Sequence, residues 1–432
     1  MLLSSMACEQ SVCLRRLAGG ARRGIIGFGR FLANPKVTTE AVIEGWPAGL
    51  AEACEGRHVL AIQDTSQINF ATTADHDRGL GEIGKGVGRG VLLHPMLAVD
   101  ASNGGLLGLV TGRVWTRRGR IATPHDKRAL SDKESERWIC TPVAAKPHLG
   151  KAAMVTEISD READIYAKWA QVPQTGFHVL TRAMHDRKIM EGGGKLSSAP
   201  LTAGGTAIVK LREQPGRPAR QAQVQMRYGQ VTLKRPEGTL EKGLPRFLAV
   251  SLVEVVEVGP RSSKAEPICW RLLTTHPVED AQKAWRIVAW YQMRWIIEQF
   301  FRTLKQQGLK LEDSQLESAE RLVKLTAIAA KAAVTIMQMV QARDSRSEQS
   351  AEIAFTPTEI ETLEALVPKL EGKTDLQKNH HPPGSLAWAA WAIAKLGGWD
   401  GYPKSRPPGP ITFRHGLQRF KSIAQGWSLR DV

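Results

Sequence analysis

Two short apolar runs, each ending in an aspartate, constrain the fold of this chain most strongly. The first runs from His58 to Asp64, and the second runs from Ala152 to Ile158 and ends at Ser159 and Asp160. Their length and composition predict strands buried on both faces, as in a sheet with helices on either side. We therefore expect an α/β fold in which both aspartates lie at carboxyl ends of strands. Open α/β sheets bind their ligands at that edge.

An aspartate after a strand also has a simpler explanation, because Asp is a common turn and N-cap residue. Asp64 is followed by Thr65 and Ser66, which would suit a turn. Glu162 and Asp164 are fully explained as acids in the first turn of a helix over 165–171, where they cap it and favour its dipole. Asp160 differs from these two because it repeats the placement of Asp64.

The stretch from Trp290 to Lys305 (WYQMRWIIEQFFRTLK) has the period of an amphipathic helix. Tyr291, Arg294, Glu298 and Lys305 fall within an arc of roughly 60° on a helical wheel. Apolar residues fill the neighbouring arc, so the pattern predicts a helix with a polar stripe at the edge of a core. Charges solvated on a surface helix are the alternative. Arg294 precedes Glu298, the weaker order for an i,i+4 ion pair, so helix stabilisation explains this pair poorly.

Between residues 176 and 277 the sequence changes to strand-like runs separated by glycine, proline and basic turns, which predicts a mainly antiparallel β insertion. Helices are expected again from residue 278 to residue 342. The most membrane-like run, Leu322 to Val340, contains Lys324 and Lys331, so a buried helix is the better interpretation. A polar linker then leads into a helical tail, in which the apolar run Leu386 to Leu396 fits either a core or an interface.

The charge balance favours a polyanionic partner. Lys and Arg outnumber Asp and Glu by 59 to 43, which gives a formal net charge of +16. A surplus of this size indicates nucleic acid rather than a membrane surface, without separating DNA from RNA. The five cysteines are scattered and form no Cys-x-x-Cys pair, which argues against a structural zinc site and favours a reduced, cytoplasmic setting. The amino terminus shows no signal-peptide pattern.

Asp64, Asp160 and Glu298 are therefore candidates for one site. Hydrolysis of a phosphodiester is helped by two divalent cations held by acidic oxygens, one to activate water and one to stabilise the leaving oxygen. An acidic site in a basic protein is the arrangement expected for an enzyme that cuts a polyanion.

These residues also stand in motifs that resemble a known family. Tyr291, Arg294, Glu298 and Lys305 match the Tyr-x2-Arg-x3-Glu-x6-Lys signature of bacterial DDE transposases of the insertion-sequence-four type. The block Asp-Arg-Glu-Ala-Asp at 160–164 is similar to the motif of the second aspartate of this family, and Ile62-Gln63-Asp64-Thr65 to that of the first. Further matching blocks extend over about residues 31–425.

The resemblance implies a ribonuclease H-like core in which Asp64, Asp160 and Glu298 bind two Mg²⁺ ions, with Mn²⁺ able to substitute. It implies cut-and-paste DNA transposition, in which an end is nicked, a hairpin forms and reopens, and the end is joined to target DNA. Tyr291, Arg294 and Lys305 would then hold phosphates of the transposon end. Trp270 matches a position that stacks on a flipped-out base, with a core tryptophan as the alternative. Arg182 matches a basic position beside the active site, with a solvated arginine as the alternative.

The expected organisation combines these readings. Residues 1–45 form a short helical DNA-contacting segment that matches the longer amino-terminal domain of the family poorly, as a truncated segment would. Residues 46–175 and 278–342 form the catalytic core, residues 176–277 the β-rich insertion, and residues 343–432 a helical dimerisation segment. The resemblance implies a homodimer on double-stranded DNA (transposon ends and target), in the bacterial cytoplasm at the nucleoid, without a membrane.

Two other functions remain open at this point. A catalytically silent DNA-binding relative could act as an inhibitor of a full-length transposase, which the short amino terminus favours and the intact carboxylates oppose. A metal-dependent nuclease without strand transfer is the other.

Overall fold

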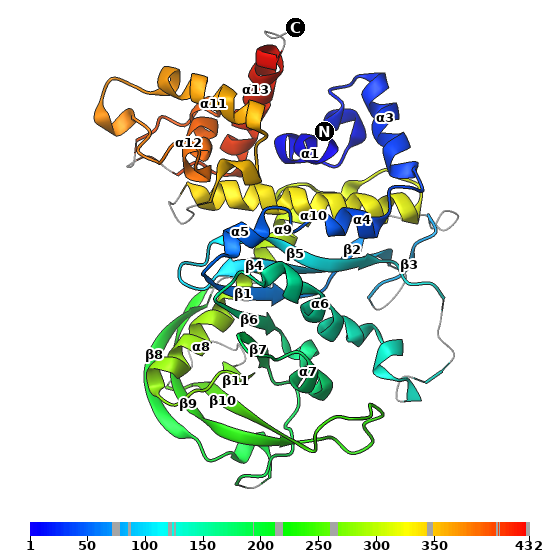
Figure 1. Ribbon diagram of the computed structural model, residues 1–432, viewed down its shortest axis with the longest axis vertical. Coiled ribbons are helices and arrows are strands. Elements are labelled where there is room, and N and C mark those ends of the chain that lie inside the picture. Colours follow the sequence, from blue (N-terminus) through cyan, green and yellow to red (C-terminus); the bar gives the residue numbers. More distant parts are fainter. Residues whose placement is uncertain are drawn as a thin grey trace.

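A mixed β-sheet with helices on both faces forms the centre of the protein in the computed structural model (Figure 1). The structure describes residues 1–70, 78–84, 88–119, 123–124, 127–192, 194–211, 219–259, 267–343, 349–402, 405 and 407–428. Among these residues the sheet has eleven strands: β1 (His58–Gln63), β2 (Ser66–Asn69), β3 (Gly81–Glu82), β4 (Arg89–Asp100), β5 (Leu106–Trp115), β6 (Met154–Ser159), β7 (Phe177–Arg182), β8 (Thr202–Leu211), β9 (Arg220–Lys234), β10 (Phe247–Glu257) and β11 (Cys269–Thr274).

Five of these strands have the ribonuclease H-like arrangement. β4 lies between β5 and β1 and is antiparallel to both. On the other side of β1, β6 runs parallel to it, and β7 runs parallel to β6. The order β5-β4-β1-β6-β7 brings the carboxyl ends of β1 and β6 to the same edge of the sheet, as expected from the two apolar runs that end in aspartate.

The inserted strands extend this sheet. β11 pairs antiparallel with β7, and β10, β9 and β8 follow in antiparallel order. They form the curved sheet around α8 in Figure 1. β7 is the last parallel strand, so the antiparallel inserted strands begin at β8.

The core strands are apolar on both faces because each face is covered. Leu60 and Ile62 of β1 join one buried cluster, which continues into the helices after residue 281. Val59 and Ala61 point the other way and join a second cluster with residues 139–169 of the helical layer opposite. A strand that alternates between two cores needs apolar residues at every position, which is the pattern of the sequence.

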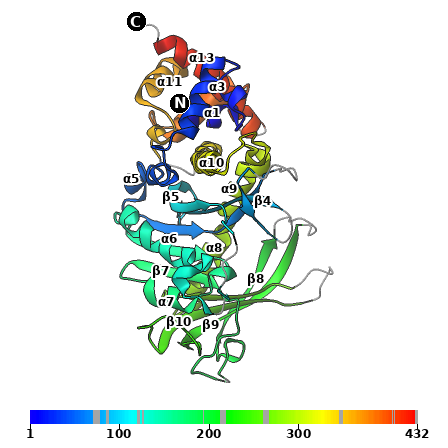
Figure 2. The same cartoon turned by 90° about the vertical axis from the view of Figure 1, so that its right-hand side faces the viewer.

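The helices occupy both sides of the sheet. They are α1 (Leu2–Glu9), α2 (Leu14–Leu17), α3 (Arg22–Ala33), α4 (Thr39–Glu44), α5 (Leu50–Cys54), α6 (Arg137–Ala145), α7 (Tyr166–Gln171), α8 (Ala281–Met293), α9 (Trp295–Arg302), α10 (Ala319–Ala342), α11 (Pro357–Leu370), α12 (Leu386–Leu396) and α13 (Pro410–Ser428). Figure 2 looks along α10, which lies between the sheet and the helices of both termini.

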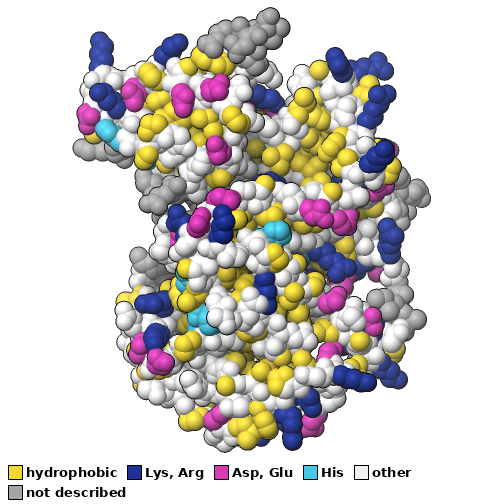
Figure 3. Space-filling model, in the orientation of Figure 1, with side chains coloured by type: hydrophobic (Ala, Val, Ile, Leu, Met, Phe, Trp, Pro, Cys, Tyr) yellow, Lys and Arg dark blue, Asp and Glu magenta, His cyan; other side chains and the backbone are white. Residues whose placement is uncertain are grey.

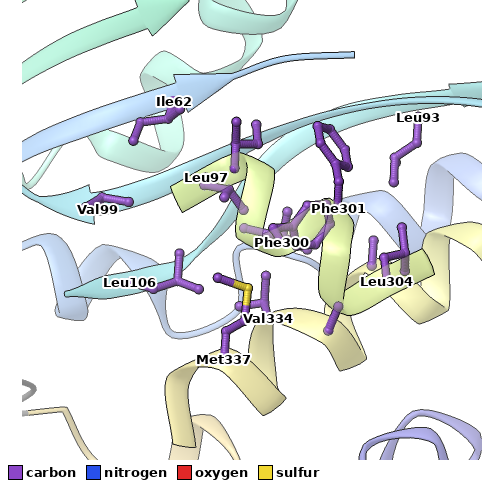
Figure 4. Close-up of a cluster of buried hydrophobic side chains, with 14 of the residues drawn as sticks. Ile62, Leu93, Leu97, Val99, Leu106, Phe300, Phe301, Leu304, Val334 and Met337 are labelled. Carbon is purple, nitrogen blue, oxygen red and sulfur yellow. The ribbon is translucent and has the colours of Figure 1, made fainter. Parts of the chain in front are cut away.

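α10 is long and apolar enough to cross a membrane by length and composition, but 83% of its most apolar window is buried inside the protein. It therefore has the character of a core helix, as the sequence predicted. Phe300, Phe301 and Leu304 fill the space between this helix and the strands, as Figure 4 shows. The helix that carries Glu298 is thus anchored by the residues that follow it.

The carboxyl-terminal helices form a third cluster with the first helix. Leu386, Trp388 and Ile393 of α12 are buried there against Phe413 and Phe420 of α13. α1 joins them, since Lys421 donates a hydrogen bond to Ser5 Oγ at 3.0 Å. The apolar face of α12 is therefore covered within one chain, which leaves the core interpretation of this helix and removes the interface one.

The stretch from Trp290 to Lys305 is helical, but the prediction of one regular helix is wrong. α8 ends at Met293 and α9 begins at Trp295, and the Arg294 amide donates to the carbonyl of Tyr291, three residues earlier. Beyond Arg302 the backbone widens into a π-helical turn, Thr303–Gln307. A tightened turn followed by a widened one shifts the phase of the side chains. Lys305 is still near enough to Glu298 for their charges to interact.

Candidate active site

Asp64 lies at an interruption in a long antiparallel hairpin. β1 and β2 both pair with β4 in one register, Gln63 with Met96 and Ser66 with Leu93, which places Asp64 opposite Pro95. Proline has no N–H to donate, so a regular ladder is disfavoured at this point. The Asp64 carboxylate accepts a 2.7 Å hydrogen bond from the amide of Thr65 through Oδ1. Its second oxygen, Oδ2, faces the helix that carries Glu298.

Asp160 follows β6 at the same edge of the sheet. Its carboxylate caps a short 3₁₀ turn, Arg161–Ala163, and accepts a 2.7 Å hydrogen bond from the Arg161 amide. The capping role expected as the alternative is therefore present. The same Oδ1 atom also accepts a hydrogen bond from the Tyr291 hydroxyl at 3.3 Å, which connects Asp160 to α8. Asp160 therefore both caps the turn and belongs to the site.

Arg294 joins the other two carboxylates. Its Nη1 donates to Asp64 Oδ2 at 2.9 Å, and its Nη2 donates to Glu298 Oε1 at 3.2 Å. The side chains of Arg294 and Asp64 are only 16% and 19% exposed, whereas Glu298 is 38% exposed, so the bridge runs from the buried edge of the sheet to the surface. The weak i,i+4 order of this pair is explained by Asp64, which draws the guanidinium toward the sheet.

The charges of these groups act on one another. Burial raises the pKa of Asp64 to about 6, and Glu298 and Asp160 add to this rise, while Arg294 opposes it. Burial would lower the pKa of Arg294, but Tyr291 and the three carboxylates together raise it above its ordinary value. Burial and then Asp160 raise the pKa of Tyr291 to about 12. Tyr291 therefore remains a hydrogen-bond donor at any ordinary pH.

The donor chemistry of the cluster fits a hard divalent cation, because three carboxylates from different elements present oxygen atoms. Within the described parts of the chain, however, no group of three His, Cys, Asp or Glu side chains is gathered closely enough to hold an ion. Arg294 takes up oxygens of both Asp64 and Glu298. A cation at these two carboxylates would therefore compete with Arg294 for these oxygens or use the second oxygen of each carboxylate.

The remaining predicted residues lie around this cluster at different distances. The Trp270 ring stands edge-on to Tyr291 with 6.0 Å between ring centroids, and it is partly buried. Arg182 donates to the carbonyl of Cys269 at 3.2 Å and lies near enough to lower the pKa of Tyr291. Lys305 Nζ lies 4.0 Å from Glu312 Oε1, and burial lowers its pKa. Asp64, Asp160, Glu298, Tyr291 and Arg294 are thus brought together, with Trp270 and Arg182 beside Tyr291.

A second set of polar residues behind the site was missed by the sequence reasoning. Gln63, His94 and Glu157 are buried in β1, β4 and β6 and are joined by hydrogen bonds to one another. Each is a polar residue within or at the end of a mainly buried strand, and this was the available signal. Buried polar groups are almost always paired, so three such interruptions predict partners even where the sequence does not show which residues pair.

Part of the chain matches a known family model. Residues 156–335 match the family model of the transposase DDE domain. The matched segment includes Asp160 and Glu298 and covers most of β6, all of β7 to β11, α8 and α9, and most of α10. This segment is therefore similar to transposase DDE domains. Domains of this kind use divalent metal ions.

The chain also has a structural likeness to the piggyBac transposase, seen in a cryo-EM structure of its synaptic complex with hairpin DNA. The TM-score is 0.33 and the sequence identity 8%, and the alignment covers 68% of this chain and 50% of the other.

Proposed function

We propose that this protein is a metal-dependent DNA transposase that excises an insertion sequence by a cut-and-paste reaction with a hairpin intermediate. The observation that carries the proposal is the cluster in which Arg294 and Tyr291 connect Asp64, Glu298 and Asp160 at one edge of a ribonuclease H-like sheet. The match to the transposase DDE domain and the formal charge of +16 support the same reaction class.

In this proposal Asp64, Asp160 and Glu298 hold two Mg²⁺ ions, or Mn²⁺ in their place. When bound, such ions activate water and stabilise the leaving oxygen of a phosphodiester. Arg294 donates to the DNA phosphate once it releases the carboxylates, and Tyr291 keeps its proton and donates from the side of Asp160. Lys305 adds a cation from the π-helical turn, and Trp270 offers a ring beside Tyr291 for an unstacked base.

Basic surfaces support a role for DNA beyond the site itself. Arg22, Arg23 and Arg30 are exposed on α3, and the outer side of this helix in Figure 3 carries a row of Lys and Arg side chains. Arg182, at the end of β7, lies near Tyr291. We infer that transposon ends and target DNA follow these surfaces in a homodimer. We further infer that the protein works in the bacterial cytoplasm, at the nucleoid.

The proposal is tested by cleavage of DNA that carries the terminal inverted repeats flanking the gene. With Mg²⁺ the wild type is expected to nick these ends and then form hairpins. Glu298→Gln keeps the shape of the side chain but removes its charge. It is expected to lower the rates of nicking and of hairpin formation by more than about 100-fold, because loss of a residue that only orients a metal ligand already costs about 10–100-fold. Products are resolved on denaturing gels. Glu317→Gln, at an exposed position before α10, is the matched control and should cleave like the wild type.

Equal cleavage by wild type and Glu298→Gln would contradict the assignment of this carboxylate. A nick that never proceeds to a hairpin would favour a nuclease without strand transfer.

A silent DNA-binding relative is the second candidate, and one observation favours it. Arg294 pairs with both Asp64 and Glu298, and the described residues present no ready metal site. A wild type that binds the ends but does not nick them with Mg²⁺ or Mn²⁺ would select this function.

A further inference from the structure

A continuous row of hydrogen bonds fixes the two neighbours of Asp64 to the protein interior. Arg137 Nε donates to Thr65 Oγ1 at 2.8 Å, and Thr65 Oγ1 lies 2.8 Å from His94 Nδ1. His94 Nε2 lies 2.9 Å from Gln63 Oε1, and Gln63 Nε2 donates to Glu157 Oε1 at 2.7 Å. Gln63 and Thr65 are the two neighbours of Asp64 in the chain, so both flanks of the aspartate are tied to the interior.

The direction of each bond in this row follows from its ends. A carboxylate only accepts, so Glu157 takes its hydrogen bond from the Gln63 amide, which leaves Gln63 Oε1 facing His94. That oxygen is an acceptor, so His94 donates from Nε2. Thr65 Oγ1 already accepts from Arg137, so its own proton is free to point to His94 Nδ1. A ring that donates from Nε2 can accept the Thr65 proton at Nδ1, so the row fits an imidazole protonated at Nε2.

The inner end of the row also reaches the second aspartate. Lys168 of α7 donates to Glu157 Oε1 at 3.0 Å and to the hydroxyl of Ser159, the residue before Asp160. Thr181 of β7 receives a third hydrogen bond from the same ammonium group at 3.0 Å. One buried cation thus links the strand ends of Asp64 and Asp160 through Glu157.

Tight packing keeps this row in a single arrangement. The His94 ring stands edge-on to Trp138 of α6 with 4.8 Å between centroids. The Arg137 guanidinium lies over the same indole at 5.2 Å. Trp138 is almost fully buried, so water has little access to compete for these bonds. Hydrogen bonds in such a dry row reinforce one another.

We propose that the row Arg137–Thr65–His94–Gln63–Glu157–Lys168 positions Asp64 and Asp160 so that their carboxylates meet at one point. This inference rests on the proposed function, since it assigns the row to the site where metal and DNA would bind. These are positioning residues, because none of them touches the reacting atoms. They set where the carboxylates stand when Arg294 releases them.

The test is a pair of variants at Thr65. Thr65→Val keeps the size and β-branching but removes the hydroxyl, so Arg137 Nε and His94 Nδ1 both lose their partner. Thr65→Ser keeps the hydroxyl. Thr206→Val, on the exposed edge of β8, is the matched control for the same chemical change. Three quantities are measured for each protein: Mn²⁺ affinity by electron paramagnetic resonance, the imidazole ¹⁵N shifts of His94, and kcat and KM for end cleavage.

In the wild type, the ¹⁵N shifts are expected to show His94 protonated at Nε2 and not at Nδ1. Thr65→Val is expected to lose about 10–100-fold in Mn²⁺ affinity and in kcat, the range typical of residues that orient metal ligands, with an unchanged KM for DNA. The Nδ1 shift should move in the same variant. Thr65→Ser should keep most of the wild-type Mn²⁺ affinity, kcat and Nδ1 shift, and Thr206→Val should match the wild type.

Two failures are distinguishable. If the wild type cleaves and binds Mn²⁺ but Thr65→Val behaves identically, the positioning role is overturned and the proposed function stands. A wild type that neither binds Mn²⁺ nor cleaves the ends overturns the proposed function and the role of the row together. A wild-type His94 protonated at Nδ1 also overturns the row, whatever the activity.

Discussion

Lys168→Met is expected to lower the free energy of unfolding by about 3–5 kcal/mol, the cost of leaving one partner of a buried ion pair unpaired. Lys168 and Glu157 are both 0% exposed, and their closest charged atoms are 2.8 Å apart. Burial lowers the pKa of Lys168, and Glu157 offsets part of that effect. Without the ammonium group, Glu157 must be protonated or remain buried and charged. Domains are typically stable by about 5–15 kcal/mol in total, so this loss is large. The measurement is the urea midpoint of unfolding.

The double variant Lys168→Met/Glu157→Gln is the control. It removes both charges and keeps an amide oxygen that can accept from Gln63. Ser159 and Thr181 can still bond each other, since their hydroxyl oxygens are 3.1 Å apart. Most of the lost stability should return, because replacing both members of a buried pair is far less costly than breaking it. A loss below about 1 kcal/mol for Lys168→Met, the level of an exposed pair, would show that the pair is hydrated in solution.

Acid is expected to destabilise the protein already between pH 7 and pH 5, although the proton that Asp64 takes up near pH 6 in the folded state opposes part of this loss. His58, His178 and His276 form a cluster beside Trp290, in which His178 and His276 stack with centroids 3.8 Å apart. Thr156 Oγ1 hydrogen-bonds both His58 and His276, at 2.8 and 2.7 Å. Burial is the main cause that lowers all three pKa values, to about 4 for His58 and about 3 for His276. Repulsion from neighbouring histidines adds to the shift of His58 and His276. The folded protein therefore contains three neutral imidazoles.

The direction of the effect follows from proton uptake. Below the unfolded pKa of about 6.5 the unfolded chain binds protons that the folded protein excludes, so stability falls as the pH drops. The loss begins near pH 6.5 and continues until the folded pKa values of about 4 and about 3 are reached. Each fully shifted histidine contributes a slope of about 1.4 kcal/mol per pH unit. His276 should approach this value, and His58 and His178 less, because they are only half-buried.

This prediction is measured by denaturant unfolding between pH 7 and pH 5, where unfolded carboxylates are still mostly ionised. His276→Gln can keep a hydrogen bond to Thr156. This variant should reduce the dependence of the free energy of unfolding on pH by the contribution of one histidine. Stability that stays constant from pH 7 to pH 5 in the wild type would refute the neutral cluster.

Much of the core could be predicted from the sequence because it depends on short-range patterns. β1 and β6, the strands of the insertion and the buried helix α10 all appear where periodicity placed them. The edge at which Asp64 and Asp160 lie followed from two apolar runs that each end in an acid. By contrast, the regular helix expected across Arg294 is interrupted, since no local pattern marks a tightened turn followed by a π-turn.

The sequence by itself determined the class of the fold and the candidate carboxylates, because burial on two faces and strand ends are properties of neighbouring residues. Only the tertiary structure decided that Arg294 joins Asp64 to Glu298, that Pro95 stands opposite Asp64, and that His94 and Gln63 connect it to Glu157. These contacts join residues far apart in the chain. Strand register and helix packing set their distances, and neither is encoded in the spacing of the residues concerned.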